Sequence, residues 1–423
     1  MKKYVICFLV LMIANSYCFA NQILMGGWQT SQYSTEYGFF SGFSQGGSSL
    51  VARHGLVSAP GVISNFRVYE DDAPGTSKNY ISTLWHDSGG GFGATDLSCT
   101  ISNAETYCAD DGDTLVVATG DYLAIETNPT GTPTKTNIYP SMLFTPTTAD
   151  YAIYAGLRGA ANYDHIHAYY GDSGNDDNFF VAPNDATLRD LQVEVSVAPG
   201  EGDTTTCTVY KNFIATDLAC TISDTETTCT DTGTLDITKD DEIVYVFSDT
   251  GTPEAANTRA GIIYQPDNEG EWVLAAGENA DLGSGTKYNS VWSSDNAWNA
   301  AEKNSGMLGL AMTITAINIR LEGAIGAGDS AVFTLRKQTR GGSYGDTALT
   351  CTVAGSETNC DDTGSISVAE DDLIVMKAVA SLSSGKRYSG SLLAYIAPAV
   401  SGNPVSLETV ITGNVTLQGV TIQ

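Results

Sequence analysis

The chain has 423 residues and a formal net charge of −29 at pH 7, because 49 acidic side chains face only 20 basic ones. Such an acidic surface excludes polyanions as partners, so we expect neither nucleic acid nor an anionic membrane surface to bind it. A hydrophobic content of 42%, with 21 Tyr and 13 Phe, excludes a disordered acidic polymer and indicates domains with buried cores.

Residues 1–20 are typical of a secretory signal peptide. Two lysines precede an apolar run from Tyr4 to Ile13, and Ala20 precedes the expected cleavage site. The run is too short to span a bilayer comfortably, and no later segment is long and apolar enough, so we expect no membrane insertion. The sequence predicts an exported protein, secreted or held at a cell surface, where disulfides persist.

A motif bounded by two cysteines occurs three times and dominates the mature chain. If the two cysteines of a copy face each other, the chain reverses at Asn103, Asp224 and Gly355, and such residues tolerate positive φ in a two-residue hairpin turn. Facing cysteines of a hairpin lie close enough for a disulfide. We predict the disulfides Cys99–Cys108, Cys220–Cys229 and Cys351–Cys360.

The strand before each turn alternates its first cysteine with aliphatic residues, which indicates that this face is buried. The aliphatic residues are Leu97 and Ile101, Leu218 and Ile222, and Leu349 and Val353. The spacing does not fit a zinc site, whose cysteines usually lie a few residues apart. Each bridge closes a short loop, so we expect it to contribute about 2 kcal/mol.

One cysteine of the mature chain has no partner in these motifs. Cys207 stands in a strand pattern at the position where the third copy has Phe333, so we interpret it as a small buried hydrophobic residue. The alternative is a disulfide to another chain.

The first cysteine recurs at positions 99, 220 and 351, and these intervals suit whole domains. Short segments rich in β-branched and aromatic residues, with frequent turns and no helical period, predict an all-β fold. Each unit is therefore predicted to be a two-sheet, jelly-roll-like β-sandwich. We place the units at residues 21–147, 148–269 and 270–398, followed by a tail at residues 399–423.

The stretch from Phe333 to Lys377, with FTLRK, DTALTCTV and SISVAEDDLIVMK, resembles a β-sandwich repeat common in phage virion and bacterial surface proteins. The strand order, and closing strands such as YSGSLLAYIAP, are similar to C1q/TNF-like jelly rolls. The resemblance covers the later half of each unit and has no catalytic signature. It implies an extracellular adhesive or structural role, often in trimers.

Each unit opens with an apolar strand and a long polar insertion. Exposed aromatic side chains beside amides can stack on sugar rings, so the aromatic residues of two insertions are candidates for binding surface glycans. They are Tyr163, Tyr169, Tyr170, Tyr288, Trp292 and Trp298. The alternative is that they pack beneath their own loops.

We expect no cofactor. Calcium is the alternative, because one insertion clusters oxygen ligands in a flexible loop. The residues are Asp172, Asp176, Asp177 and Asn178, without the spacing of an EF-hand. No enzyme is predicted, because no nucleophile motif is present and the four histidines do not correspond between units. His86 stands where the other units have Lys211 and Lys337, which we interpret as a variable surface position.

The tail alternates polar and apolar residues around Gly413 and Asn414, which predicts a hairpin. It either packs on the third unit, pairs with the sheet edge of a neighbouring subunit, or is disordered. Our first hypothesis is an exported, non-enzymatic structural or adhesive protein that assembles with itself into an oligomer or filament. The second is a secreted carbohydrate-binding protein that uses the aromatic insertions.

Overall fold

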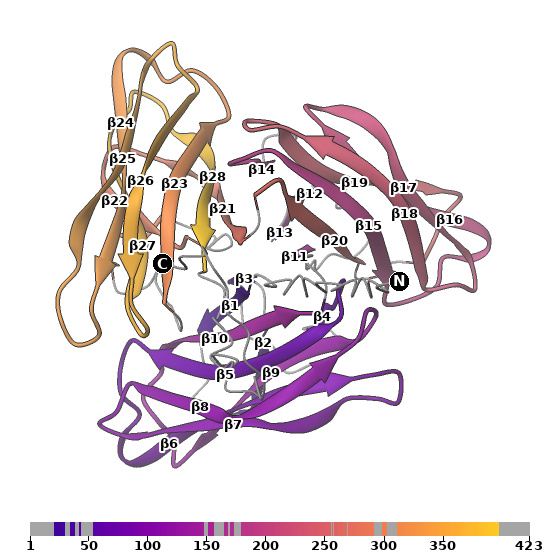
Figure 1. Cartoon of the computed structure of the whole chain (residues 1–423), viewed down its shortest axis with the longest axis horizontal. Coiled ribbons are helices and arrows are strands. Elements are labelled where there is room, and N and C mark those ends of the chain that lie inside the picture. The colour runs from indigo at the N-terminus through magenta and orange to yellow at the C-terminus, as the bar shows by residue number, and fades with distance from the viewer. Residues whose placement is uncertain are drawn as a thin grey trace, which may run out of the picture.

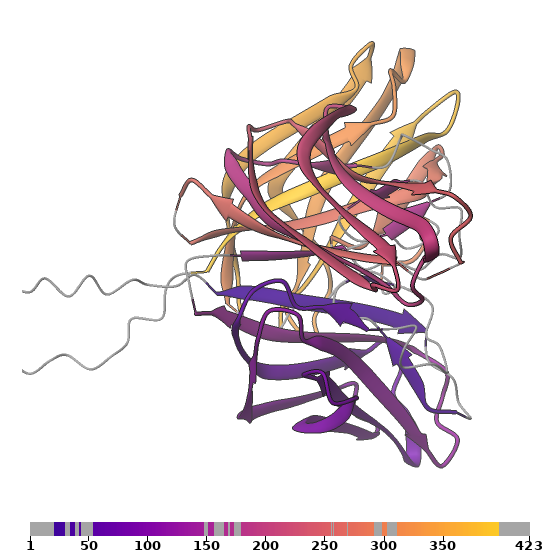
Figure 2. The same cartoon turned by 90° about the vertical axis from the view of Figure 1, so that its right-hand side faces the viewer.

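The computed structural model describes most of the chain, and the regular elements in the described ranges are all β-strands. Figure 1 shows three lobes around a common centre, and Figure 2 shows the first lobe lying beneath the other two. The described residues are 21–29, 34–38, 42–43, 54–147, 151–155, 165–167, 170–172, 179–254, 256, 258–268, 270–291, 298–302 and 311–396.

Unit 1 forms two sheets, with the strand orders β3-β1-β10-β5-β8 and β2-β9-β6-β7, and β4 also pairs with β9. Its strands are β1 (Gln22–Gln29), β2 (Glu36–Gly38), β3 (Gly42–Phe43), β4 (Gly55–Leu56), β5 (Gly61–Glu70), β6 (Gly75–Asp87), β7 (Gly93–Asn103), β8 (Tyr107–Val117), β9 (Tyr122–Thr130) and β10 (Asn137–Pro146).

Unit 2 has the sheets β11-β20-β15-β18 and β13-β12-β19-β16-β17, and β14 also pairs with β19. Its strands are β11 (Tyr151–Ala155), β12 (His165–His167), β13 (Tyr170–Asp172), β14 (Phe180–Val181), β15 (Ala186–Val195), β16 (Gly200–Lys211), β17 (Ile214–Asp224), β18 (Thr228–Ile237), β19 (Glu242–Thr250) and β20 (Thr258–Pro266).

Unit 3 repeats the arrangement in the sheets β21-β28-β23-β26 and β22-β27-β24-β25. Its strands are β21 (Glu271–Leu282), β22 (Gly285–Asn289), β23 (Met312–Leu321), β24 (Gly326–Gln338), β25 (Gly345–Gly355), β26 (Asn359–Val368), β27 (Leu373–Ser381) and β28 (Lys386–Tyr395). From β5, β15 and β23 onward, the strands are distributed between the two sheets in the same order in each unit, whereas the strands of the opening insertions differ. The predicted all-β fold of three tandem jelly-roll-like sandwiches is confirmed.

The cores follow from the alternation of apolar residues along the strands, and they join neighbouring units. Unit 1 has a core of its own that also contains Ile263 of β20. Units 2 and 3 share a continuous core, which Ile23 and Met25 of β1 complete. Since apolar side chains of one unit are buried in the core of another, the units pack as one body rather than as separate beads on a chain.

The three predicted disulfides are present, with Cα–Cα separations of 5.7, 5.8 and 5.6 Å. Their geometry differs from the predicted hairpin. In unit 1, β7 pairs with β6 while β8 pairs with β5, so Cys99 and Cys108 bridge the two sheets at one side of the sandwich. Each disulfide therefore ties the two layers together instead of reinforcing a ladder.

The turns inside the cysteine motifs use the predicted residues. Asn103, Asp224 and Gly355 have φ values of 57°, 53° and 60°, in the left-handed region that favours Asn, Asp and Gly. A hydrogen bond from the amide of Glu105 to the carbonyl of Ser102 (3.0 Å) closes the first turn. The predicted buried face is also confirmed, since Leu97 and Ile101 are each 1% exposed.

An aspartate two residues after the second cysteine braces each disulfide corner. Asp110, Asp231 and Asp362 accept a hydrogen bond across the sheets from a main-chain amide of the preceding strand, at 3.1, 2.9 and 2.9 Å. The other oxygen of Asp231 accepts from Gly233 (2.8 Å). The acidic residues after each motif thus have a structural role, because they accept hydrogen bonds from main-chain amides that have no acceptor on a neighbouring strand.

Removing one brace should weaken its unit. Asp231→Ala leaves the amide of Ala219 without its acceptor, so we expect a loss of about 1–2 kcal/mol in the free energy of unfolding. Asp217→Ala, at an exposed site on the adjoining strand, is the matched control and should change stability by less than about 0.5 kcal/mol. Urea denaturation of both variants checks this, and equal losses would contradict the assigned role.

Candidate functional site

Networks of buried polar side chains lie where the units meet. Arg67, Gln192 and Asn318 occupy the same position in the three units, one residue before the partner of the second cysteine. They are polar, yet only 3%, 6% and 1% exposed. Arg67 bonds to unit 3, Gln192 to unit 1 and Asn318 to unit 2. Contacts that run head to tail and return to their origin form a closed ring.

The junction of units 1 and 2 is built around Glu194 on β15. Its Oε2 accepts from Nη1 of Arg259 on β20 (3.0 Å) and lies 3.3 Å from Nε2 of His54. Arg259 also donates from Nε to the carbonyl of His54 (2.8 Å). Beside them, Gln192 donates to the carbonyl of Ser58 (3.1 Å). The buried cation, Arg259, thus joins its own unit to the main chain of unit 1.

Burial and charge act in opposite directions at this junction. Burial would raise the pKa of Glu194, but the hydrogen bond from His54 and the charge of Arg259 outweigh it and hold the pKa below its ordinary value. Burial and the charge of Glu194 raise the pKa of Tyr122 to about 12. The His54 ring packs edge-on against Tyr122, with centroids 4.8 Å apart. The carboxylate of Glu194 is therefore enclosed by aromatic rings as well as by its hydrogen-bond donors.

The junction of units 2 and 3 repeats the arrangement with other side chains. Nδ2 of Asn318 donates to Oδ1 of Asp240 (2.7 Å), and Nε of Arg320 pairs with Oε1 of Glu242 (2.8 Å). Burial raises the pKa of Glu242 although Arg320 opposes the shift. Arg320 occupies the strand position that Glu194 occupies in unit 2. The same position thus holds an acidic side chain in one junction and a basic side chain in the next.

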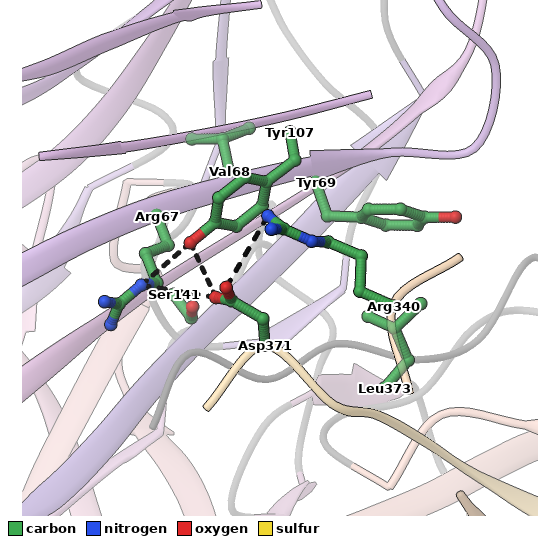
Figure 3. A pocket seen from close by; sticks show the side chains of 8 residues that line it. All are labelled: Arg67, Val68, Tyr69, Tyr107, Ser141, Arg340, Asp371 and Leu373. Carbon is green, nitrogen blue, oxygen red and sulfur yellow. Dashed lines mark hydrogen bonds and ion pairs between the residues drawn. The ribbon is translucent and has the colours of Figure 1, made fainter. Parts of the chain in front are cut away.

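The junction of units 3 and 1 is shown in Figure 3. The guanidinium of Arg67 pairs with Asp111 of its own unit (2.8 Å) and with Glu370 and Asp371 of unit 3. Nε of Arg67 donates to the hydroxyl of Tyr107 (3.0 Å), and that hydroxyl donates to Oδ1 of Asp371 (2.6 Å). Among the described residues, this one buried cation therefore pairs with three acidic side chains from two units.

A second arginine covers this network. The guanidinium carbon of Arg340 lies 4.0 Å above the centre of the Tyr107 ring, a cation–π contact, and its Nη1 lies 3.5 Å from Asp371. Burial and the hydrogen bond to Asp371 raise the pKa of Tyr107 to about 12. The phenol consequently stays neutral at physiological pH and can donate to Asp371.

The cavity at this junction is small. With Tyr107, Asp371 and the two arginines, Val68, Tyr69, Ser141 and Leu373 line it, and its volume is ≈ 10 Å³. This is space for about one water molecule. The geometry fits a packed interface better than a pocket for an organic substrate.

The left-handed corner before β9, β19 and β27 explains how the junctions differ. It is occupied by Gly120, Asp240 and Asp371, with φ values of 90°, 74° and 65°. The aspartates reach Asn318 and the Arg67 network, respectively. Glycine has no side chain to offer, so in the first junction Gln192 bonds to a main-chain carbonyl instead.

His86 is not the variable surface position that the sequence comparison indicated. Its Nε2 lies 2.7 Å from Oδ2 of Asp121, and both side chains are largely buried. The corresponding pairs are Lys211 with Asp241 (2.8 Å) and Lys337 with Asp372 (3.1 Å). Each unit thus has a basic side chain on the long strand β6, β16 or β24 that pairs with the aspartate immediately before β9, β19 or β27. The signal in the sequence was that an aspartate recurs at the equivalent position of each unit, as Asp121, Asp241 and Asp372.

Three of the six predicted glycan-binding residues lie in the described part. Trp298 is 8% exposed, and its ring packs 4.7 Å from Tyr388 and 6.5 Å from Phe333, inside the core of units 2 and 3. This matches the alternative of packing beneath the loop. Tyr288 is half-buried and its main chain pairs with Asn299. Tyr170 lies in β13, while Tyr163, Tyr169 and Trp292 lie outside the described residues.

The predicted calcium ligands are likewise only partly described. Asp172 ends β13, where its main chain is in register with His165 of β12. The other three, Asp176, Asp177 and Asn178, lie outside the described residues, and calcium binding stays a prediction. In the part of the chain that the structure describes, no group of three or more His, Cys, Asp or Glu could hold a metal ion.

The unpaired Cys207 is fully buried and free, in register with Cys220. Burial raises the pKa of its thiol. Its interpretation as a small core residue is confirmed, and its burial argues against a bridge to another chain. Among the described residues, no helix is long and apolar enough to cross a membrane.

Comparison with known proteins identifies no family, since no family model and no curated protein matches the sequence. Similar solved chains include one from the triple jelly roll fold and turret assembly in an archaeal virus, at 13% identity and a TM-score of 0.19, covering 80% of this chain and 79% of that one. Another, from the atomic structure of Sulfolobus Turreted Icosahedral Virus, has 12% identity, a TM-score of 0.18 and 80% coverage of both chains. Similarity at this level supports no conclusion about function.

Proposed function

We propose that this chain is an exported, non-enzymatic structural or adhesive protein, which acts as a self-assembling subunit in which one chain supplies a ring of three jelly rolls. The observation that carries the proposal is the cyclic set of junctions at Arg67, Gln192 and Asn318. C1q/TNF-like jelly rolls, which the sequence resembles, often form trimers. Here the three covalently linked units of one chain close into a ring.

Two further features support the proposal. The three disulfides suit an oxidising environment outside the cytoplasm. Many acidic side chains are engaged in holding the fold: Asp110 and its counterparts accept from amides, and Asp121 and its counterparts pair with basic side chains. Carboxylates that act as hydrogen-bond acceptors within the fold favour a structural role for the protein over a catalytic one.

A carbohydrate-binding role has less support. Trp298, one of the strongest candidates for stacking on a sugar, lies in the core. Loss of binding on a glycan array after Trp292→Ala, with no loss after Trp298→Ala, would favour this role over the structural one.

The solution mass of the mature protein tests the structural proposal. We expect an oligomer or filament. If calcium has no part in the assembly, its mass will be the same in calcium as in EDTA. Deleting residues 399–423 will reduce the mass if the tail pairs with a neighbouring subunit. A monomer under every condition would contradict self-assembly.

A further inference from the structure

We propose that the seam between units 3 and 1 is an exchangeable interface, which a second copy of this chain can fill. This inference rests on the proposed self-assembling role and names the surface that would serve it. The seam consists of an acidic corner of unit 3, with Glu370 and Asp371, and a socket on unit 1, with Arg67 and Tyr107.

The seam is the one junction of the ring without a short connection. Unit 1 continues into unit 2 between Pro146 and Tyr151, and unit 2 into unit 3 between Pro266 and Glu271. Arg67 and Glu370, by contrast, are 303 residues apart in sequence. If the two short connections keep their junctions together, opening the ring will occur at the seam.

An open seam leaves complementary surfaces at the two ends of one chain. The side chain of Arg67 is only 4% exposed, and opening would remove two of its three acidic partners. Arg340 and Asp371 would likewise lose Tyr107. The socket is basic and the corner is acidic, so both ends favour renewed contact with their counterpart.

A second copy carries the same two surfaces. Reciprocal contact between two open chains gives a closed dimer in which unit 3 of each chain docks on unit 1 of the other, while serial contact gives a filament. The intramolecular seam is favoured in dilute solution, because the linked units have a high effective concentration. Exchange should therefore rise with protein concentration.

Two complementary charge variants of the full mature chain test the exchange. One carries Arg67→Glu, which disables the socket, and the other carries Glu370→Lys and Asp371→Lys, which disable the corner. Each alone has like charges across every possible seam. Mixed in equal amounts, they can form a dimer in which one seam is native and the other has its charges reversed but still complementary.

We expect the mixture to contain at least about tenfold more of the two-chain species than either variant alone, because like charges across an interface are strongly unfavourable. The readout is the solution mass by light scattering. Combining all three substitutions in one chain should restore the single-chain ring. A mixture that keeps the single-chain mass would overturn the proposal.

A matched control uses a junction with a short connection. Arg320→Glu and Glu242→Arg disrupt the pair between units 2 and 3, and their mixture should form no dimer. If the charge variants fail to fold, hydrogen exchange of the wild-type chain decides the question. Amides near Asp371 should then exchange faster than those near Asp240, and equal protection would contradict the seam as the point of opening.

The outcome is separable from that of the proposed function. If wild-type protein is a monomer but the mixed variants form dimers, the seam is exchangeable and the self-assembling role fails. If wild-type protein assembles but the mixed variants do not dimerise, assembly uses another surface and the seam proposal fails.

Discussion

Glu70→Val should stabilise the protein, by on the order of 3 kcal/mol at pH 7. Glu70 is 0% exposed, and neither carboxyl oxygen has a hydrogen-bond partner in the described structure. The same strand position holds Val195 in unit 2 and Leu321 in unit 3. Valine would fill an apolar site that units 2 and 3 already fill with aliphatic side chains.

The effect depends on pH. Burial, and secondarily the charge of Asp71, raise the pKa of Glu70 from 4.5 to about 9. Between these values the folded protein holds a proton that the unfolded chain has released, so the stability of wild-type protein falls as pH rises through this window. Glu70→Val removes this contribution to the slope, and its advantage should grow from pH 5 to pH 9.

Urea denaturation at pH 5, 7 and 9, monitored by hydrogen exchange of unit 1 amides, checks the prediction. Glu70→Gln is the control, because it abolishes titration but keeps a buried polar group, so it should flatten the slope and stabilise less than valine. Identical pH slopes in wild-type and Glu70→Val protein would contradict the buried carboxyl as the cause.

Arg259→Ala should have the largest destabilising effect, about 3–5 kcal/mol. The arginine is 0% exposed, and its removal leaves Glu194 buried with one fewer cationic partner while the carbonyl of His54 loses a donor. Thermal unfolding of the variant should show a lower midpoint. Because the residue lies between units 1 and 2, hydrogen exchange should increase on both sides of that junction.

Arg189→Ala is the matched control. Arg189 is also an arginine of unit 2, but its ion pair with Asp190 is partly exposed, and we expect a change below about 1 kcal/mol. The double variant Arg259→Leu with Glu194→Leu should recover part of the loss, because an apolar pair leaves no buried charge. Equal effects of Arg259→Ala and Arg189→Ala would contradict the assigned role.

The local features of the fold could be predicted because they depend on neighbouring residues. The cysteine spacing and the left-handed positions at Asn103, Asp224 and Gly355 are such features, and the structure confirms them. The pairing of strands could not be predicted in the same way. Alternation shows which face of β7 is buried but not that its partner is β6 rather than β8.

The junctions were harder to predict because equivalent positions hold different side chains. Arg67, Gln192 and Asn318 share a strand position but not a charge, so comparing the repeats gave no sign of a shared role. His86 misled for the same reason, since a histidine in place of lysine suggested variability. Only the three-dimensional structure shows that all these side chains face a partner.

Covalent linkage of the three units has a consequence for how their junctions can vary. In a ring of three identical chains, one residue position of the sequence occurs in all three junctions, so a substitution there changes all three at once. Here each junction has its own position, so one can use Arg67 with acidic partners, the next Gln192 with a carbonyl, and the third Asn318 with an aspartate. Each interface is free to diverge without altering the other two, and every unit can recognise its own place in the ring.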